Sequence, residues 1–472
     1  MKIAKNLFYN ASYQILLVLL PLVTVPYVSR VLGPEGIGIN SYTNSIASFF
    51  MILGSLGIDK YGTRQIAYLI GEKKDVSKTF TEIILLKFVT IGSILLCYFI
   101  YCFSVTNYRQ YLLAQSLLII AAAIDISWFF MGMEDFKKTV LRNTLVKLIS
   151  ALLIFIFVRK PDDVQIYIVI LTGSIFMGNF TLWPYAKKYF VSFSKTFKGI
   201  RKHIRPSLHF FVPQISVSFY LLLNKTMLTW LVSVEAAGFF DNSDKVIRVL
   251  LAIATASGTV MLPRVANTFA SGDIEKVNRY VTQFFDLVSF ISLPIMFGLI
   301  AIIPSYSTVL FGSEFDGISN IICLMAPSIW FISLGNVFGI QYLVATKQLK
   351  YYTIALLCGE GLNLILNLMF LPKFGVNAAG LNMSVSELTI ILIQMYFVRK
   401  QVDFSGAFKN IIKYFVASLL MFFTVRFISS FQTVSVISLL ILIFVGVLTF
   451  MISILIFKPT SLNLVKNLVY KK

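Results

Sequence analysis

Residues 434–457 form an uncharged apolar stretch, VSVISLLILIFVGVLTFMISILIF. A helix needs about 20 mostly apolar residues to cross the roughly 30 Å hydrocarbon core of a membrane, and this stretch is long enough. Similar stretches recur along the whole chain of 472 residues, which is 57% hydrophobic and 13% charged, with a mean hydropathy of +0.82. Soluble domains average roughly 45–50% apolar and 25% charged residues. The sequence therefore predicts an all-α polytopic membrane protein.

We expect about fourteen transmembrane helices, counted as apolar stretches of spanning length with no soluble domain between them. The first stretch is too long and too rich in proline for a cleavable signal peptide, so we expect it to stay in the mature chain. The predicted spans are residues 8–31, 38–58, 80–103, 110–131, 143–158, 164–183, 208–232, 239–262, 280–302, 317–340, 351–371, 377–397, 411–429 and 434–457.

The positive charges follow alternate loops. The formal net charge is +20, and the longest basic loop, residues 184–207, contains no acidic residue. The loops between the basic ones are short and carry a mixture of acids and bases. By the positive-inside rule, both termini are predicted to be cytoplasmic, and an even number of spans fits this because it places both termini on the same side. This placement explains the charge without a nucleic-acid partner.

Residue types that support catalysis or metal binding are sparse. The four cysteines lie inside apolar spans without ligand spacing, and the two histidines, His203 and His209, lie at a predicted cytoplasmic loop. We therefore expect no disulfide and no metal site. The chain contains neither a phosphate-binding G-x-x-x-x-G-K-[ST] loop nor an H-E-x-x-H helix, so ATP hydrolysis and zinc chemistry have no basis in the sequence. We predict a transporter without a cofactor, and not an enzyme.

An internal repeat organises the chain. Residues 30–38 (RVLGPEGIG) align with residues 230–238 (WLVSVEAAG) at an offset of 200 residues, so that a glutamate and a glycine recur. The same offset places residues 62–64 (GTR) opposite residues 262–264 (LPR). Several matches in one register indicate duplication. A repeat of six spans predicts two lobes of the same orientation with the substrate path between them. The predicted parts are residues 1–205, residues 206–400, and residues 401–472 with the last two helices.

One span carries charges where a membrane helix rarely does. Residues 239–248 (FFDNSDKVIR) place Asp241, Asp244, Lys245 and Arg248 at the start of an apolar span. Charges in hydrocarbon are costly and usually face a polar path, so these residues are candidates for a transport cavity. Arg248 lies about nine residues into the span, on the order of 13 Å deep at 1.5 Å per residue. Arginine and lysine in an enclosed site bind phosphate strongly.

Polar stripes at helical spacing accompany this span. They occur on the first two spans of each repeat, and a second polar group lies on the eleventh and twelfth spans. Their members include Asn40, Asn44, Ser48, Gln214, Ser218 and Lys225, followed by Glu360, Asn363, Asn367, Asn382 and Glu387.

Structural alternatives stay open for each of these residues. Asp241 can pair locally with Lys245 at i+4, and the asparagine stripes can serve as hydrogen bonds between helices. Arg30, at the outer end of the first span, is equally compatible with a packing role. Lys87, Lys147 and Lys413 are expected to extend to the cytoplasmic face.

Several motifs together resemble one family. The chain is similar to polysaccharide flippases of the Wzx type, which handle O-antigen or capsular repeat units and belong to the multidrug/oligosaccharidyl-lipid/polysaccharide superfamily. The motifs are RVLGPEGIG at residues 30–38, DISWFFMGMEDFK at 125–137, GFFD at 238–241 with Lys245, MLPR at 261–264, LFGSEF at 310–315, and Asn363-x-x-x-Asn367 followed by LPKFGVNAAG at 371–380.

The resemblance implies a two-lobed fold of about fourteen helices. It also implies that an undecaprenyl-pyrophosphate-linked oligosaccharide moves from the inner to the outer leaflet of the bacterial cell membrane by alternating access. A cationic cavity would hold the pyrophosphate, and a polysaccharide polymerase is a candidate partner. Expected substrate-binding residues are Arg248, Lys225, Lys245, Arg30 and Arg64, with Asp241 and Asp244 beside them. Candidate sites for a coupling ion are Asp125, Asp241, Asp244, Glu360 and Glu387.

Three alternatives are retained. A flippase for lipid II or teichoic acid is the nearest, and a multidrug antiporter of the same superfamily requires acidic residues to dominate the cavity. A membrane glycosyltransferase or polymerase requires large outer loops with catalytic residues, whereas the outer loops here are mostly shorter than about fifteen residues.

Overall fold

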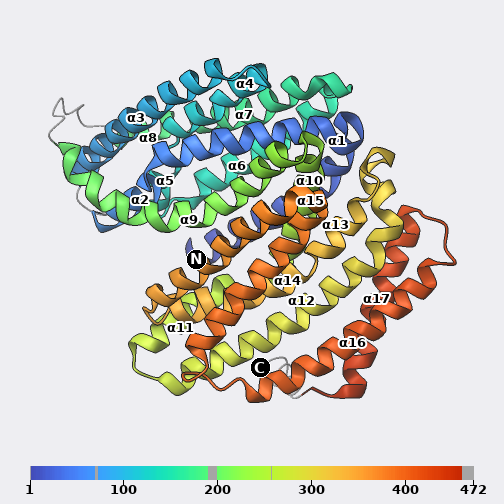
Figure 1. Cartoon of the computed structure of the whole chain (residues 1–472). Helices are drawn as coiled ribbons and strands as arrows, with labels where there is room; N and C mark the ends of the chain where they lie inside the picture. The colour runs from blue at the N-terminus through green and yellow to red at the C-terminus, as the bar shows by residue number, and fades with distance from the viewer. Residues whose placement is uncertain (1, 70–72, 190–198, 257, 460–472) are drawn as a thin grey trace. The chain divides into compact units, whose positions relative to one another are not determined.

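The computed structural model describes residues 2–69, 73–189, 199–256 and 258–459 (Figure 1). These residues form helices and loops without a β-strand. The chain divides into two compact units, residues 1–238 and residues 239–472. The predicted boundary between the lobes, at residues 205 and 206, lies one helix earlier than this division.

The described residues of the first unit form nine α-helices that belong to it entirely, the beginning of a tenth, and two short 3₁₀ turns. They are α1 (Lys2–Ser55), α2 (Ile58–Tyr68), α3 (Lys73–Ser104), α4 (Arg109–Ala123), α5 (Ser127–Gly132), α6 (Phe136–Phe157), η1 (Pro161–Asp163), α7 (Val164–Phe180), α8 (Trp183–Ala186), η2 (Lys187–Tyr189), α9 (Arg201–Leu231) and the start of α10 (Val234–Thr255). Helices α1 to α9 form the frame of this unit. Helix α1 packs against α3, α4, α6 and α9.

The second unit begins within α10. Its other elements are α11 (Gly258–Ala270), α12 (Ile274–Phe311), η4 (Ser313–Phe315), α13 (Ile318–Met325), α14 (Pro327–Gly335), the π-helix η5 (Asn336–Val344), α15 (Leu349–Val398), α16 (Ser405–Ser429) and α17 (Val436–Phe457). In this unit α12 packs along α16, and α16 packs against α17. Within the described part of the chain, nine helical segments are long and apolar enough to cross a membrane.

Two pairs of predicted spans are joined in single long elements. Span 8–31 and residues 38–55 of span 38–58 lie in α1, whereas residue 58 already belongs to α2; spans 351–371 and 377–397 both lie in α15. Each element is broken by one glycine with a positive φ, which is 65° at Gly33 and 60° at Gly375. Glycine adopts this conformation without the steric cost that a Cβ atom would bring. A single residue therefore replaces the loop that the apolar pattern predicts.

The predicted span 239–262 is wrong at its C-terminal end. Helix α10 ends at Thr255, and α11 begins at Gly258. The small residues at this point weaken a continuous helix, and the carbonyl of Gly258 accepts a hydrogen bond from Gln341 Nε2 at 2.8 Å. Residues 258–262 therefore belong to a separate helix rather than to the end of the span.

The two copies of the repeated turn contact each other reciprocally. A Cβ atom on Gly38 would lie 1.9 Å from the carbonyl oxygen of Val234, and one on Gly238 would lie 2.1 Å from that of Pro34. Residue 38 corresponds to 238 and residue 34 to 234 in the repeat alignment. A reciprocal contact between equivalent residues is what a self-complementary interface produces. The contact supports the alignment and requires glycine at both positions.

Candidate functional site

The charged turn of α10 consists of two local ion pairs. Lys245 Nζ lies 2.7 Å from Asp241 Oδ2, and Arg248 Nε lies 2.7 Å from Asp244 Oδ2, each at the i, i+4 spacing of a helix. The local pairing of Asp241 with Lys245 that the sequence left open is thus present. The aspartate side chains are only 6% and 7% exposed, whereas the lysine is 30% and the arginine 45% exposed. The two carboxylates are therefore buried, and the two cationic groups lie at the surface of the helix.

One of the predicted acidic residues, Glu387, lies near Arg248. Glu387 is close enough to Arg248 and to Glu360 for their charges to interact. Both glutamates lie on α15, on either side of the break at Gly375. The structure therefore brings three of the predicted residues together in the second unit.

A ladder of asparagines runs between the two halves of α15. Asn367 Nδ2 donates to Asn363 Oδ1 at 2.9 Å, and Asn382 Nδ2 donates to Asn367 Oδ1 at 2.9 Å. All three side chains are buried. Buried polar groups need partners, so this ladder holds the two halves together.

The predicted residues of the first unit lie on three different helices. Lys225 is half-buried in α9, Arg30 is exposed in α1, and Arg64 is exposed in α2. The Arg64 guanidinium stacks over the ring of Phe210 at 4.7 Å. Arg64 thus stacks on α9, the helix that also carries Lys225, whereas Arg30 lies on α1.

The polar stripe of residues 40–55 serves at least partly to join helices. Gln115 Nε2 of α4 donates to Asn40 Oδ1 at 3.3 Å, and Asn44 Nδ2 donates to Gln115 Oε1 at 3.5 Å. The hydrogen-bonding role that the sequence left open for these asparagines is therefore present. The side chains of Gln214 and Ser218 lie outside the described residues.

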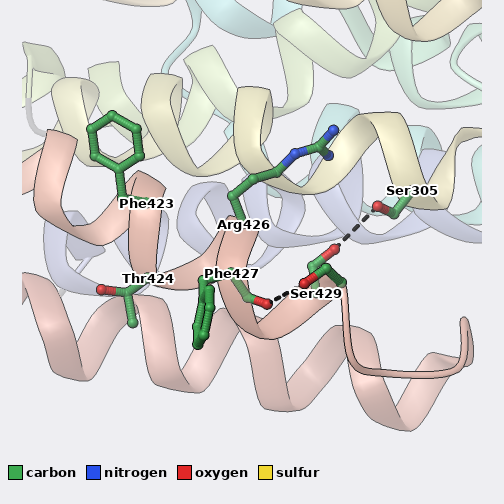
Figure 2. A pocket seen from close by; sticks show the side chains of 7 residues that line it. Ser305, Phe423, Thr424, Arg426, Phe427 and Ser429 are labelled. Carbon is green, nitrogen blue, oxygen red and sulfur yellow. Dashed lines mark hydrogen bonds between the residues drawn. The ribbon is translucent and has the colours of Figure 1, made fainter.

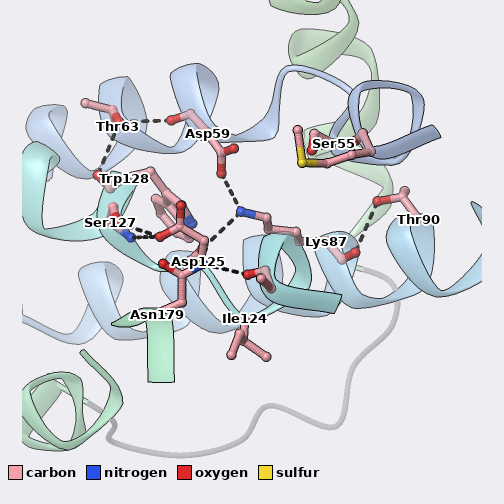
Figure 3. Close-up of polar contacts among 12 residues, drawn as sticks. Ser55, Asp59, Thr63, Lys87, Thr90, Ile124, Asp125, Ser127, Trp128 and Asn179 are labelled. Atoms are coloured by element: carbon pink, nitrogen blue, oxygen red, sulfur yellow. Dashed lines mark hydrogen bonds and ion pairs between the residues drawn. The ribbon is translucent and has the colours of Figure 1, made fainter. Parts of the chain in front are cut away.

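Lys87 does not extend to the cytoplasmic face, and that prediction was wrong. Its side chain is 1% exposed, and Nζ donates to Asp59 Oδ1 at 2.5 Å and to the carbonyl of Asp125 at 2.9 Å (Figure 3). The carboxylate of Asp125 accepts from the backbone and hydroxyl of Ser127 at 2.8 and 2.5 Å. These contacts tie α2, α3 and α5 together and give Asp125 a local structural role.

Arg142 and Asn179 extend this network. Arg142 donates to Asn179 Oδ1 and to the Ser127 hydroxyl, and Asn179 Nδ2 donates to the carbonyl of Ala121 at 2.7 Å. The sequence patterns did not identify Asn179 because a lone asparagine in an apolar span has no repeating partner. Its position in α7, near the end of a span that the loop charges predict to be cytoplasmic, was the available signal.

Removing Asp59 is expected to destabilise the protein more than removing Lys87. Asp59→Ala leaves a buried ammonium uncompensated, which costs about 3–5 kcal/mol. Lys87→Met costs less, because the carboxylate of Asp59 is 44% exposed and can be hydrated. Thermal unfolding of both variants in detergent measures the difference. The exposed pair of Lys138 and Asp135 provides a control in Asp135→Ala, and equal losses in all three variants would contradict the prediction.

His203 lies in the first turn of α9 rather than in a loop. Its Nδ1 lies 2.6 Å from the Tyr61 hydroxyl, and its Nε2 lies 3.0 Å from Glu82 Oε2, which Lys202 Nζ approaches at 2.7 Å. Burial lowers the pKa of His203 below its ordinary value of 6.5, and burial raises the pKa of Tyr61. The cluster fixes the start of α9 against α2 and α3.

One surface pocket lies in the second unit. It measures about 840 Å³ and is open to the surface beside the last turn of α16 (Figure 2). The hydroxyls of Ser305 and Ser429 form a 3.1 Å hydrogen bond at its edge. Its lining residues are Ser305, Phe423, Thr424, Arg426, Phe427, Ser429 and Ser430. None of the residues predicted for the site lines it.

Comparisons with known proteins agree with this architecture. The sequence profile of the family described as "Polysaccharide biosynthesis protein" matches residues 3–269. A protein of Escherichia coli (strain K12) whose name describes an O-antigen transporter is 22% identical over 407 residues, covering 84% of this chain and 97% of that protein.

Two solved structures share the fold. A lipid II flippase, MurJ, in an inward closed conformation superposes with a TM-score of 0.77 at 17% identity, covering 98% of this chain and 100% of that one. An inward-facing multidrug resistance MATE family transporter of the MOP superfamily gives a TM-score of 0.65 at 13% identity, covering 85% and 99%. The chain thus belongs to the family of polysaccharide biosynthesis proteins, and it shares the multi-pass membrane fold of the MurJ and MATE structures.

Proposed function

We propose that this protein moves undecaprenyl-pyrophosphate-linked oligosaccharide repeat units from the inner to the outer leaflet of a bacterial cell membrane. The transport proceeds by alternating access and supplies the synthesis of a surface polysaccharide. Both termini are cytoplasmic in this proposal, as the distribution of lysine and arginine among the loops predicts. A polysaccharide polymerase is the natural consumer of the product.

The observation that carries the proposal is the orientation of the charges on α10. Asp241 and Asp244 are buried, whereas Lys245 and Arg248 expose their cationic groups. An anion that approaches this helix meets an ammonium and a guanidinium first, and the carboxylates behind them hold both cations in position. A pyrophosphate gains charge-assisted hydrogen bonds from such a pair, which are roughly twice as strong as neutral ones.

The relatives support the same substrate class. The Escherichia coli protein named for O-antigen transport matches this chain over almost its whole length. O-antigen repeat units are lipid-linked oligosaccharides, so a substrate with a lipid tail, a pyrophosphate and a sugar head fits both the name and the charges on α10. Lys225 and Arg30 remain candidate contacts to the same substrate.

Two alternatives have specific support. The fold of a lipid II flippase covers 98% of this chain, which favours lipid II or a teichoic-acid precursor as the nearest alternative substrate. Glu387, which lies near Arg248 and near Glu360, favours a cation-coupled mechanism, as in a multidrug antiporter, with Glu360, Asp125, Asp241 and Asp244 as further candidates for the coupling ion.

Ligand-dependent thermal unfolding distinguishes these substrates. A ligand that binds the folded state raises the melting temperature of the purified protein. We expect a short-chain prenyl-pyrophosphate oligosaccharide to raise it, and to raise it less in Arg248→Ala. A lipophilic drug cation is expected to have no effect. Stabilisation by the drug cation alone would contradict the proposal and favour the antiporter.

A further inference from the structure

Two short helices repeat at the offset of 200 residues and are not part of the charged turn of α10. They are α2 (Ile58–Tyr68) and α11 (Gly258–Ala270), and each follows the second span of its repeat. Each contains one arginine at the equivalent position, Arg64 and Arg264. Both arginines are exposed. The chain therefore carries two copies of one surface feature.

The inner face of α2 is fixed against its own unit. Ile58, Tyr61 and Ile66 are buried, and the Thr63 hydroxyl donates to the carbonyl of Trp128 at 3.2 Å (Figure 3). A Cβ atom on Gly62 would lie 2.5 Å from the Trp128 ring, so the helix lies directly on that side chain. The outer face is thus held in a defined orientation.

The outer face of α2 combines two cations with an aromatic ring. Lys60, Arg64 and Tyr68 recur at i, i+4 and i+8, and all three are exposed, Tyr68 to 73%. The one acidic residue of the helix, Asp59, is bonded to the buried Lys87. An exposed stripe of cations and an aromatic ring is typical of helices at a membrane surface.

Helix α11 in the second unit repeats the exposed, stacked arginine of α2, but not Lys60 or Tyr68, whose equivalents are Val260 and Thr268. Val265 is buried in the core, whereas Arg264, Pro263 and Asn267 are exposed. The Arg264 guanidinium stacks over the ring of Tyr280 at 5.2 Å, as that of Arg64 stacks over Phe210 at 4.7 Å. Helix α11 contains no acidic residue. Aromatic stacking holds the plane of each guanidinium and leaves its edge directed away from the ring.

We propose that Arg64 and Arg264 each bind the phosphate of an anionic phospholipid at the membrane surface that carries the predicted cytoplasmic loops. The planar guanidinium matches a phosphate in bidentate geometry, and the negative surface of the cytoplasmic leaflet attracts such cations. Duplication favours a bulk lipid over the transported lipid, because each unit has its own copy, whereas the flippase moves one substrate at a time. The inference is independent of the substrate proposed for α10.

Native mass spectrometry of the detergent-purified full-length protein tests the proposal. Dioleoyl phosphatidylglycerol is titrated against wild type, Arg64→Gln, Arg264→Gln and the double variant, with phosphatidylcholine as the neutral lipid. We expect each single variant to weaken one phosphatidylglycerol adduct roughly fivefold, which corresponds to about 1 kcal/mol per cation near an anionic surface. The double variant loses both adducts. Arg159→Gln, an exposed arginine at the opposite end of its span, is the matched control and keeps both.

Three outcomes overturn the proposal. The first is unchanged binding of phosphatidylglycerol by the double variant. The second is that the double variant loses phosphatidylcholine binding as much as phosphatidylglycerol binding. The third is displacement of phosphatidylglycerol from the wild type by an equal concentration of farnesyl pyrophosphate. The last would assign the sites to the transported lipid. Arg64→Lys and Arg264→Lys keep the charge and are expected to retain part of the binding, which separates loss of phosphate contact from misfolding. Failure of the substrate proposal leaves these expectations unchanged.

Discussion

Gly38→Ala is expected to lower the free energy of unfolding by about 3 kcal/mol or more, the upper range for a group forced into a packed interior. The added Cβ atom would lie 1.9 Å from the carbonyl oxygen of Val234, and 3.2 Å from the amide nitrogen of Gly238. Backbone atoms cannot rotate away as a side chain does, so the two turns must separate. Gly238→Ala is expected to have a similar effect through the carbonyl of Pro34.

The expected change in the free energy of unfolding has the opposite sign to the change that intrinsic helix propensity alone would produce. Alanine in place of glycine normally favours a helix interior by about 1 kcal/mol. Gly173 provides the matched control, because it lies in helix α7 and a Cβ atom there would have no neighbour within 4 Å. Thermal unfolding in detergent compares the three variants. Gly38→Ala that unfolds at the same temperature as Gly173→Ala would show that the repeated turns do not pack this closely.

Arg248→Ala is expected to reduce the transport rate by about 10- to 100-fold. A hydrogen bond to a charged group contributes about 1.5–3 kcal/mol, and 1.4 kcal/mol corresponds to a factor of ten. The exposed guanidinium is one of two cations presented on α10, so its loss removes much of the attraction for a pyrophosphate. Lys245→Ala is expected to have a smaller effect, because the ammonium is a single point charge without the bidentate geometry of arginine.

Asp244→Asn tests whether transport needs Arg248 to be held in position by its carboxylate partner, or needs only the positive charge of Arg248. It keeps the size of the side chain but removes the anion that holds Arg248 Nε at 2.7 Å. Transport is expected to fall less than in Arg248→Ala, since the cation remains. Lys409→Ala removes an exposed positive charge elsewhere in the second unit and is the control. Equal rates in Arg248→Ala and Lys409→Ala would remove Arg248 from the substrate site.

The sequence predicted the class of fold well, because hydropathy and loop charge are local properties. The repeat was also visible, and the reciprocal contact of Gly38 and Gly238 supports its register. The breaks within helices were harder to predict. Gly33 and Gly375 each replace a loop with one residue, and the end of α10 at Thr255 leaves no mark in the apolar pattern.

The candidate site was predictable only in part. The i, i+4 spacing on α10 already allowed the pairs of Asp241 with Lys245 and of Asp244 with Arg248. Which partner is buried depends on neighbouring helices and could not be predicted from the spacing. The burial of Lys87 could not be predicted from spacing either, because its partner Asp59 lies 28 residues away on a different helix.

The most direct test of the central claim is flipping of a labelled lipid-linked oligosaccharide by the purified protein in proteoliposomes. A membrane-impermeant probe outside the vesicles reports the fraction of labelled lipid that it can reach, under an imposed membrane potential or ion gradient. We expect wild-type protein to increase this fraction over time, and Arg248→Ala to do so about 10- to 100-fold more slowly. A wild-type protein that leaves the lipid in its original leaflet under every gradient would contradict the claim that this chain is a flippase for lipid-linked oligosaccharides.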